Sequence, residues 1–205
     1  MALIIKANRC QTPLETVMFA LKSDQEKWNR RYEREHHINA PDEFLVTHAS
    51  ILRTGLALDL ACGLGGNSIF LAECSYTVHA VDISHQALLK LHREAVLRNL
   101  AIQPIVADLD YFSLPLQNYD LIIVFYFFSR DLMPSIVAAL KDNGLLFYAT
   151  YNTRHVSVRP GFNKDYLIQP DELVQYFSGF DILVHEPDAG ENRNISRVLA
   201  RKESR

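Results

Sequence analysis

The feature that most restricts the possible fold is an apolar run that leads directly into a glycine-rich turn. It occupies Ala57–Asn67, and helix-compatible residues follow through Leu71. Glycines allow positive φ and close approach of a ligand to the main chain, and a helix N-terminus beyond such a turn offers free N–H groups. The run therefore predicts a strand, a tight turn and a helix. The turn serves either to bind a ligand or only to pack the helix on a sheet.

A carboxylate at the end of the next apolar strand favours ligand binding. Asp82 follows the predicted strand 76–81, about twenty residues after the glycines. At the end of the second strand of a βαβ unit, a carboxylate can accept hydrogen bonds from both hydroxyls of a ribose. The turn and Asp82 together predict a nucleotide-like ligand.

Strands and helices then alternate along the chain. After the glycine turn we expect the elements helix 66–74, strand 76–81, helix 84–99, strand 103–107, strand 119–126, helix 131–141 and strand 144–150. Such alternation requires right-handed crossovers and gives a mostly parallel sheet with helices on both faces. Ligands of these sheets bind at the carboxyl ends of the strands. The turn after Asp59, together with Asp82, Asp108 and Tyr126, is expected at that edge.

The end of the chain departs from this alternation. Segments 181–186 and 195–200 have the pattern of short strands, and the six residues from Pro187 to Asn192 do not suffice for a connecting helix. We therefore expect an antiparallel hairpin, preceded by a helix that starts at 170–172.

Several motifs resemble those of the class I S-adenosylmethionine (SAM) dependent methyltransferases. Asp59-x-x-x-Gly63-x-Gly65-x-Asn67 is similar to motif I, whereas a dinucleotide fingerprint would have a third glycine in place of Ser68. The later motifs of the family resemble, in order, the segments 81–84, 107–109, 119–124 and 140–146. The opening Trp28–Tyr32 resembles that of small bacterial methyltransferases such as the tellurite-resistance and thiopurine enzymes, and the match runs roughly from residue 24 to residue 202.

This resemblance implies a Rossmann-like, doubly wound α/β fold with a mostly parallel seven-stranded sheet and a C-terminal antiparallel hairpin. It implies SAM as cofactor and methyl transfer to a small-molecule acceptor, for which a soft or anionic nucleophile is a candidate. The implied cofactor-binding residues are Trp28, Tyr32, Asp59, Ala61, Cys62, Gly63, Gly65, Asn67, Asp82, Ile83, Asp108, Leu109 and Phe125.

Specific roles follow for some of these residues. Asp82 would hold the ribose, and Asp108 would accept from the adenine amine between Ile83 and Leu109. The backbone of 61–65 would lie near the methionine moiety. Asp59 would either orient the ammonium group or brace the turn. Trp28 and Tyr32 would line the pocket from a helix that starts at Ser23 and folds over the cofactor, or would pack as ordinary core aromatics.

Substrate contacts are expected from the end of strand 119–126 and from the long segment 152–169. That strand lacks the [Asn/Asp]-Pro-Pro-[Tyr/Phe] sequence used on base amines, which disfavours nucleic-acid acceptors. Candidate substrate residues are Tyr126, Arg130, His155 and Arg159. Their alternatives are a core residue for Tyr126, an ion pair for Arg130 and a solvated loop for the other two. No catalytic residue and no metal ligand is assigned.

Composition limits the remaining possibilities. A net charge of −3 argues against a broad phosphate-binding surface, and three cysteines without a CxxC pair argue against a zinc site. The longest apolar run, 121–128, is too short to span a membrane, and the N-terminus lacks a signal-peptide pattern.

We therefore expect a cytoplasmic monomer or homodimer with a small-molecule substrate and no nucleic-acid or membrane partner. It would consist of an appendage (1–22) and a methyltransferase domain (23–205). The alternatives are a SAM- or nucleotide-binding module without transferase activity and, disfavoured by Ser68, Asp59 and the hairpin, a nicotinamide-dependent oxidoreductase.

Overall fold

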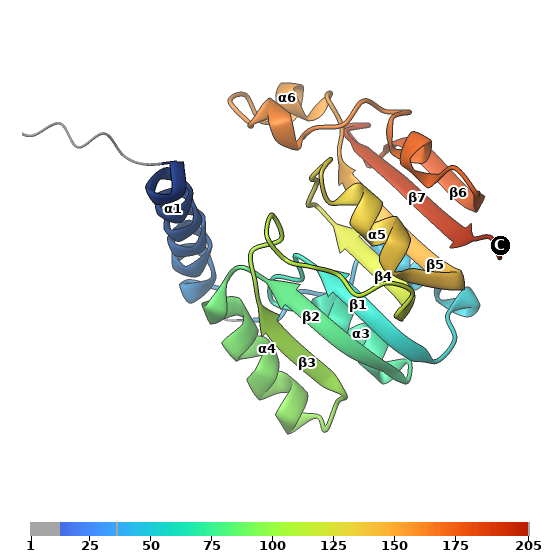
Figure 1. Cartoon of the computed structure of the whole chain (residues 1–205), viewed down its shortest axis with the longest axis horizontal. Helices are drawn as coiled ribbons and strands as arrows, with labels where there is room; N and C mark the ends of the chain where they lie inside the picture. Colours follow the sequence, from blue (N-terminus) through green and yellow to red (C-terminus); the bar gives the residue numbers. More distant parts are fainter. Residues whose placement is uncertain (1–12, 36, 205) are drawn as a thin grey trace, which may run out of the picture.

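The structure contains one seven-stranded sheet with helices on both faces (Figure 1). It is a computed structural model that describes residues 13–35 and 37–204, with side chains from residue 23 onward. The strands are β1 (Gly55–Leu60), β2 (Tyr76–Asp82), β3 (Ile102–Val106), β4 (Tyr119–Phe125), β5 (Leu140–Tyr151), β6 (Phe180–Ala189) and β7 (Ile195–Lys202). Their order is β3-β2-β1-β4-β5-β7-β6. The pairs among β1 to β5 are parallel, whereas β7 runs antiparallel to β5 and β6, so the predicted fold is confirmed.

Helices connect the parallel strands as the alternation predicted. The α-helices are α1 (Pro13–Glu33), α2 (Glu43–Thr47), α3 (Gly66–Glu73), α4 (His85–Leu97), α5 (Met133–Ala139) and α6 (His155–Val158). Three short 3-10 helices cover Ala49–Ile51 (η1), Lys164–Tyr166 (η2) and Leu173–Phe177 (η3). Ser84 caps α4 as expected, because its side chain accepts a hydrogen bond from the N–H of Ala87.

The sheet separates two apolar layers. On one face, side chains of β1, β4, β5 and β7 pack with α5 and η3, and Tyr148 and Ile136 lie in this cluster. On the other face, Phe147 and Leu71 pack with Phe44 of α2, and a smaller cluster joins α3, α4 and β2. Alternating side chains of the central strands supply both layers. Asp82 and the glycine turn after Asp59 lie at the carboxyl ends of the strands, between these two layers.

The first helix differs from the prediction. Residues 14–21 have the spacing of a short amphipathic helix, but they and the helix predicted to start at Ser23 form one continuous α1, so the predicted start at Ser23 is wrong. No proline or glycine lies between Pro13 and Glu33, and the Ser23 capping pattern alone does not interrupt a helix. The strand suggested at 3–5 lies outside the described residues. The division at residue 22 remains a prediction.

Three further boundaries need correction. The segment 140–143 belongs to β5 instead of the helix predicted at 131–141, because Leu140 pairs with Tyr119 across a register shift. The helix expected from Pro170 is reduced to the 3-10 turn η3. The apolar residues between Phe44 and Leu52 have helical spacing and predict one helix through Leu52, but α2 ends at Thr47 and is followed by η1.

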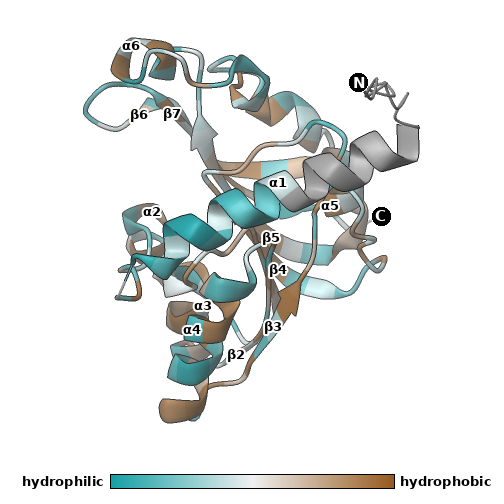
Figure 2. Ribbon diagram, turned by 90° about the vertical axis from the view of Figure 1, so that its left-hand side faces the viewer, coloured by the Kyte–Doolittle hydropathy of each residue, from teal (hydrophilic) through white to brown (hydrophobic). Residues whose placement is uncertain are grey.

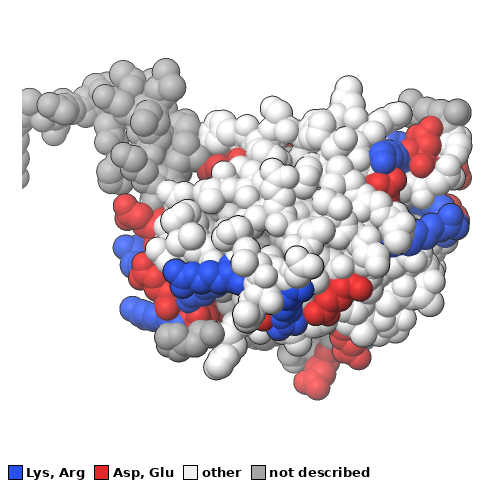
Figure 3. Space-filling view, turned by 90° about the horizontal axis from the view of Figure 1, so that it is seen from below, with Lys and Arg blue, Asp and Glu red and all other residues white. Residues whose placement is uncertain are grey.

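The exterior carries charged side chains of both signs. The described part of α1 is largely hydrophilic where it crosses in front of the strands in Figure 2. On the face drawn in Figure 3, basic side chains lie beside acidic ones. Among the described residues, none of the helices has the length and hydropathy required to cross a membrane.

Candidate functional site

The glycine turn connects β1 to α3 through three left-handed residues. Ala61 and Gly63 both have φ of 55°, and Gly65 has φ of 79°. The turn is held by hydrogen bonds from Cys62 N to Val81 O (3.0 Å) and from Gly65 N to Cys62 O (2.9 Å). Left-handed backbone suits glycine but costs a residue such as Ala61 about 1–2 kcal/mol. The turn is thus a strained connection at the carboxyl edge of the sheet, where β1 lies between β2 and β4.

The start of α3 is packed tightly by the segment before α2. A Cβ built on Gly66 would lie 2.2 Å from the backbone oxygen of Asn39, and the N–H of Asp42 donates to Asn67 Oδ1 at 2.7 Å. These contacts leave no room for a side chain at residue 66. They place Asn67, a predicted cofactor residue, against residues 39–42.

We expect Gly66→Ala to destabilise the protein by about 2 kcal/mol, since the methyl group displaces a backbone carbonyl with no flexible atoms to give way. Circular dichroism during heating measures this as a lower Tm. His92→Ala, at an exposed position in the middle of α4, is the control, because it adds no methyl contact and no backbone strain. Equal losses in the two variants would contradict the packing argument.

Asp59 is buried beneath the turn and points at α3. It is 1% exposed, and Oδ2 accepts a hydrogen bond of 2.6 Å from Ser68 Oγ. Burial raises the pKa of the Asp59 carboxyl to about 7, although Ser68 opposes the shift. This contact agrees with the bracing alternative for Asp59.

Asp82 ends β2 and holds the turn from the neighbouring strand. Its Oδ2 accepts from Gly63 N and its Oδ1 from Ser84 N, each at 2.8 Å. Burial raises the pKa of the Asp82 carboxyl, and the two N–H groups counteract this by stabilising the ionised form. Each carboxylate oxygen has a second lone pair, so the group retains acceptors for a diol.

The C-terminal half of α1 covers the turn. Tyr32 Oη would lie 2.7 Å from a Cβ on Gly63, and the Tyr32 ring stacks on Trp28 with centroids 5.8 Å apart. Burial and the nearby Asp82 raise the pKa of the Tyr32 phenol. Tyr32 is therefore brought to the glycine turn, and Trp28 stacks on it from the same helix.

Polar contacts with α4 fix this position of α1. Asn29 Oδ1 accepts from Ser84 Oγ (2.8 Å) and from Gln86 N (3.2 Å), and Gln25 Nε2 donates to Ile83 O (3.1 Å). Lys90 Nζ donates to carbonyl groups at the end of α1, including that of Tyr32. A cation at a helix C-terminus is favourable. The sequence did not identify Asn29 or Lys90 as site residues, because their hydrogen bonds join α1 to α4, which are far apart in the chain.

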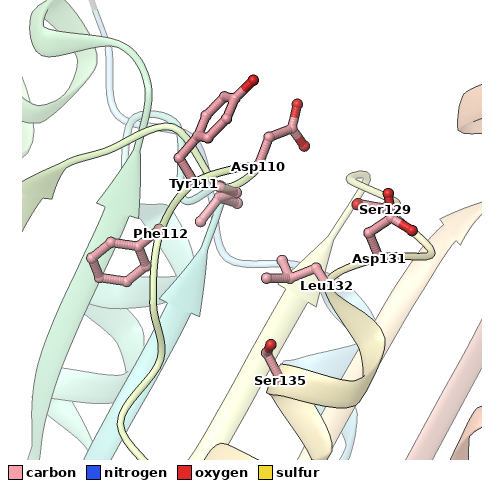
Figure 4. Close-up of a pocket in the computed structure, with 8 residues that line it drawn as sticks. Asp110, Tyr111, Phe112, Ser129, Asp131, Leu132 and Ser135 are labelled. Atoms are coloured by element: carbon pink, nitrogen blue, oxygen red, sulfur yellow. The ribbon is translucent and has the colours of Figure 1, made fainter.

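Two of the predicted adenine residues, Asp108 and Leu109, lie in the loop after β3, and the third, Ile83, follows β2. Asp108 Oδ1 accepts from Asp110 N at 3.0 Å, and Leu109 is 8% exposed. Leu109 also lines a cavity of about 380 Å³ between this loop and the segment 129–135. Figure 4 shows Asp110 on one side of this cavity and Ser129 with Asp131 on the other. The cavity and the Asp82 carboxylate lie along the same strand edge.

The end of β4 lies at the same strand edge, on the other side of the glycine turn from β2 and β3. Phe125 is 8% exposed and packs in the apolar layer with Phe44. Tyr126 has φ of 59°, and its hydroxyl donates to Asp42 Oδ2 at 2.7 Å. Asp42 was considered only as a helix start, and its link to Tyr126 joins residues too far apart in sequence to be inferred from a local pattern.

Ring contacts extend from Tyr126 toward α6. The Tyr126 and Tyr151 centroids are 5.3 Å apart, and His155 stacks on Tyr151 at 3.9 Å. The imidazole Nδ1 of His155 lies 2.7 Å from Asn194 Nδ2. Burial, together with the nearby Arg159, lowers the pKa of His155, which favours the neutral ring.

Of the two predicted arginines, Arg159 adjoins this group through the Phe162 ring, which contacts Tyr151 and His155, whereas Arg130 does not. Arg130 makes an ion pair with Glu172 at 2.9 Å and donates to Leu167 O, which agrees with its ion-pair alternative. Arg159 is exposed, with its guanidinium 5.8 Å from the Phe162 ring. A different arginine, Arg197 of β7, lies in the region of Tyr126.

Comparison with known proteins gives a family assignment. The family described as tellurite resistance protein TehB matches residues 23–200. The curated "Probable S-adenosyl-L-methionine-dependent methyltransferase TehB" of Haemophilus influenzae is 26% identical over 190 residues, which cover 83% of this chain and 65% of that protein. The chain thus spans slightly less than two thirds of the length of this relative.

Solved structures agree on the fold. The TehB structure from Haemophilus influenzae has a TM-score of 0.68 at 20% identity, over 87% of this chain and 67% of that one. A Haemonchus contortus phosphoethanolamine N-methyltransferase 2, solved with phosphomonomethylethanolamine and S-adenosylhomocysteine, has a TM-score of 0.62 at 17% identity, over 78% and 52% of the chains. At these identities the likeness shows the methyltransferase fold. The family match includes the whole sheet except the last two residues of β7. The chain therefore belongs to the TehB family and has the fold of the class I SAM-dependent methyltransferases.

Proposed function

We propose that this protein transfers a methyl group from SAM to a small-molecule acceptor. The main support for the proposal is the position of the Asp82 carboxylate. It is held at the end of β2, beside the strained turn, by hydrogen bonds from Gly63 N and Ser84 N. The family assignment and the name of the curated relative support it.

The residues at the strand edge fit SAM by their donor and acceptor chemistry. Asp82 retains lone pairs for the ribose hydroxyls, and Asp108 with the buried Leu109 offers an acceptor beside an apolar surface for adenine. Tyr32 and the turn residues 61–65 would enclose the methionine moiety. When bound, SAM supplies an electrophilic methyl group, so the protein mainly has to align the two reactants and exclude water.

The acceptor would bind on the β4 and β5 side of the turn. Tyr126, Tyr151 and the neutral His155 lie there in ring contact. The Arg197 guanidinium lies 5.5 Å from the Phe44 ring, with an 18% exposed side chain, and makes an ion pair of 3.5 Å with Glu186. A cation beside aromatic rings suits a soft or anionic nucleophile, so we propose this class of acceptor. Arg130 is not part of the proposal, because it is held by Glu172 and Leu167 O and lies over the Phe128 ring instead of this group of rings.

A thermal-shift titration with SAM, S-adenosylhomocysteine and NAD tests the cofactor, because a ligand that binds only the folded state raises its Tm. We expect stabilisation by the first two and none by NAD. A panel of thiols and oxyanions with methyl-labelled SAM then tests transfer. SAM binding without transfer to any acceptor would instead favour the binding-module alternative, and no shift with SAM would overturn the proposal.

A further inference from the structure

Tyr126 is held in an unusual conformation beside the proposed acceptor site. Its φ of 59° turns the chain out of β4 while its N–H still donates to Ala149 O at 2.7 Å. A left-handed tyrosine is strained, and such strain is found preferentially at functional sites. The side chain remains 44% exposed, so the phenol is accessible to a ligand.

The carboxylate that accepts from this phenol is equally well fixed. Asp42 Oδ2 accepts from Tyr126 Oη at 2.7 Å, and Oδ1 accepts from Phe44 N at 2.9 Å as the N-cap of α2. Its own N–H donates to Asn67 Oδ1 at 2.7 Å. Asp42 is therefore bound to the first turn of α3 and to the end of β4 at the same time.

This pair lies on the side of the glycine turn opposite to the nucleoside residues. Val124, two residues before Tyr126, pairs with Leu60, the last residue of β1 before the turn. In the sheet order, β2 and β3, which precede Asp82 and Asp108, lie on the other side of β1 from β4. A donor bound along β1 to β3 would thus present its methyl group toward the pair, at the point where the strand order reverses.

We propose that Tyr126 and Asp42 form a proton relay that deprotonates the methyl acceptor, which is accordingly a protic nucleophile such as a thiol. This inference rests on the proposed methyl transfer. The acceptor gives its X–H proton to Tyr126 Oη and forms the X–C bond, while the bond between the methyl carbon and sulfur breaks and its electron pair stays on the sulfur. Tyr126 releases its own phenol proton to Asp42 Oδ2, from which it passes to water.

The electrostatic surroundings favour a relay over a preformed phenolate. Burial and the hydrogen bond to Asp42 raise the pKa of Tyr126, whereas Arg197 opposes the shift and Tyr151 adds to it. The phenol therefore stays protonated until Asp42 takes its proton. Arg197 makes an ion pair with Glu186. The carboxylate that accepts the hydrogen bond of the Tyr126 phenol is that of Asp42.

The test compares the wild-type protein with Asp42→Asn, Tyr126→Phe and the control Glu43→Gln, using two thiol probes. Asparagine retains the N-cap and the acceptor for Tyr126 but cannot take a proton. Glu43, the exposed neighbour in the first turn of α2, controls for the loss of one negative charge. The probes are benzyl mercaptan, which is largely protonated at neutral pH, and thiophenol, which is largely ionised.

With benzyl mercaptan we expect kcat to fall about 100-fold in Asp42→Asn and Tyr126→Phe, the usual contribution of a positioned base. The SAM dissociation constant from calorimetry and the kcat of Glu43→Gln should be unchanged. With thiophenol the loss should be less than about 3-fold, and with benzyl mercaptan it should shrink as the pH rises, because an ionised thiol needs no base. A structural role would lower both kcat values equally at every pH.

Retention of kcat with benzyl mercaptan in Asp42→Asn, equal losses with both thiols, or wild-type transfer to thiophenol alone would overturn the relay. Calorimetry separates this from failure of the proposed function. Absence of SAM binding to the wild-type protein would overturn both proposals, whereas SAM binding with transfer to neither thiol would overturn the relay alone.

Discussion

Asp82→Ala should weaken SAM binding about 100-fold. Two hydrogen bonds from ribose hydroxyls to a carboxylate are lost, and a bond to a charged group is worth about 1.5–3 kcal/mol. The variant should also unfold at lower temperature, because the N–H groups of Gly63 and Ser84 lose their acceptors. Isothermal calorimetry with SAM measures the first effect, and circular dichroism shows the temperature range in which the variant remains folded.

Asp181→Ala is the control for this prediction. Asp181 is an exposed carboxylate of β6, the strand at the other end of the sheet order from β3 and β2. Its removal should change SAM affinity less than about 3-fold, since an exposed charge contributes little. If folded Asp82→Ala bound SAM as tightly as the wild type, the assignment of Asp82 to the ribose would be wrong.

The fold could be predicted from the sequence wherever local patterns and the global topology agree. Apolar strands alternating with helices fixed the parallel order, and the short spacing between 186 and 195 left only a hairpin. Ser84 was recognisable as a cap because capping depends on residues three positions apart. The errors occur where tertiary contacts decide an element's limits. Leu140 and Lys141 fit a helix locally, but Leu140 pairs with Tyr119 in the sheet.

The site could be predicted less completely, because its contacts join distant segments. The glycine turn and the carboxylates that follow β2 and β3 are readable as strand-end patterns. The bond between Tyr126 and Asp42 and the fixation of α1 by Asn29 depend on how separate elements pack. For Arg130 the sequence left an anion contact and an ion pair as alternatives, and the structure pairs it with Glu172 from a later segment.

Asp59 predicts a pH dependence of stability that does not involve any ligand. Its pKa is raised by burial from an ordinary 3.8 to about 7, so the folded state favours the neutral carboxyl. The stabilisation from this neutral form is complete below pH 4 and is lost as the pH rises through 7. The difference between 3.8 and about 7 corresponds to about 4 kcal/mol. The unfolding free energy of the wild-type protein should therefore decline between about pH 4 and pH 7, with little further change from this group above pH 7.

Asp59→Asn should remove most of this decline. Asparagine still accepts from Ser68 Oγ but does not ionise, so at pH 8 the variant should be more stable than the wild type by about 3 kcal/mol, with little difference at pH 4. Urea unfolding at several pH values measures this. Asp181→Asn, at an exposed position of β6, should retain the wild-type slope. A slope in Asp59→Asn as steep as in Asp181→Asn would show that Asp59 is ionised in the folded protein. From the raised pKa and the buried contact with Ser68 we propose that Asp59 braces the glycine turn, in its neutral form below pH 7.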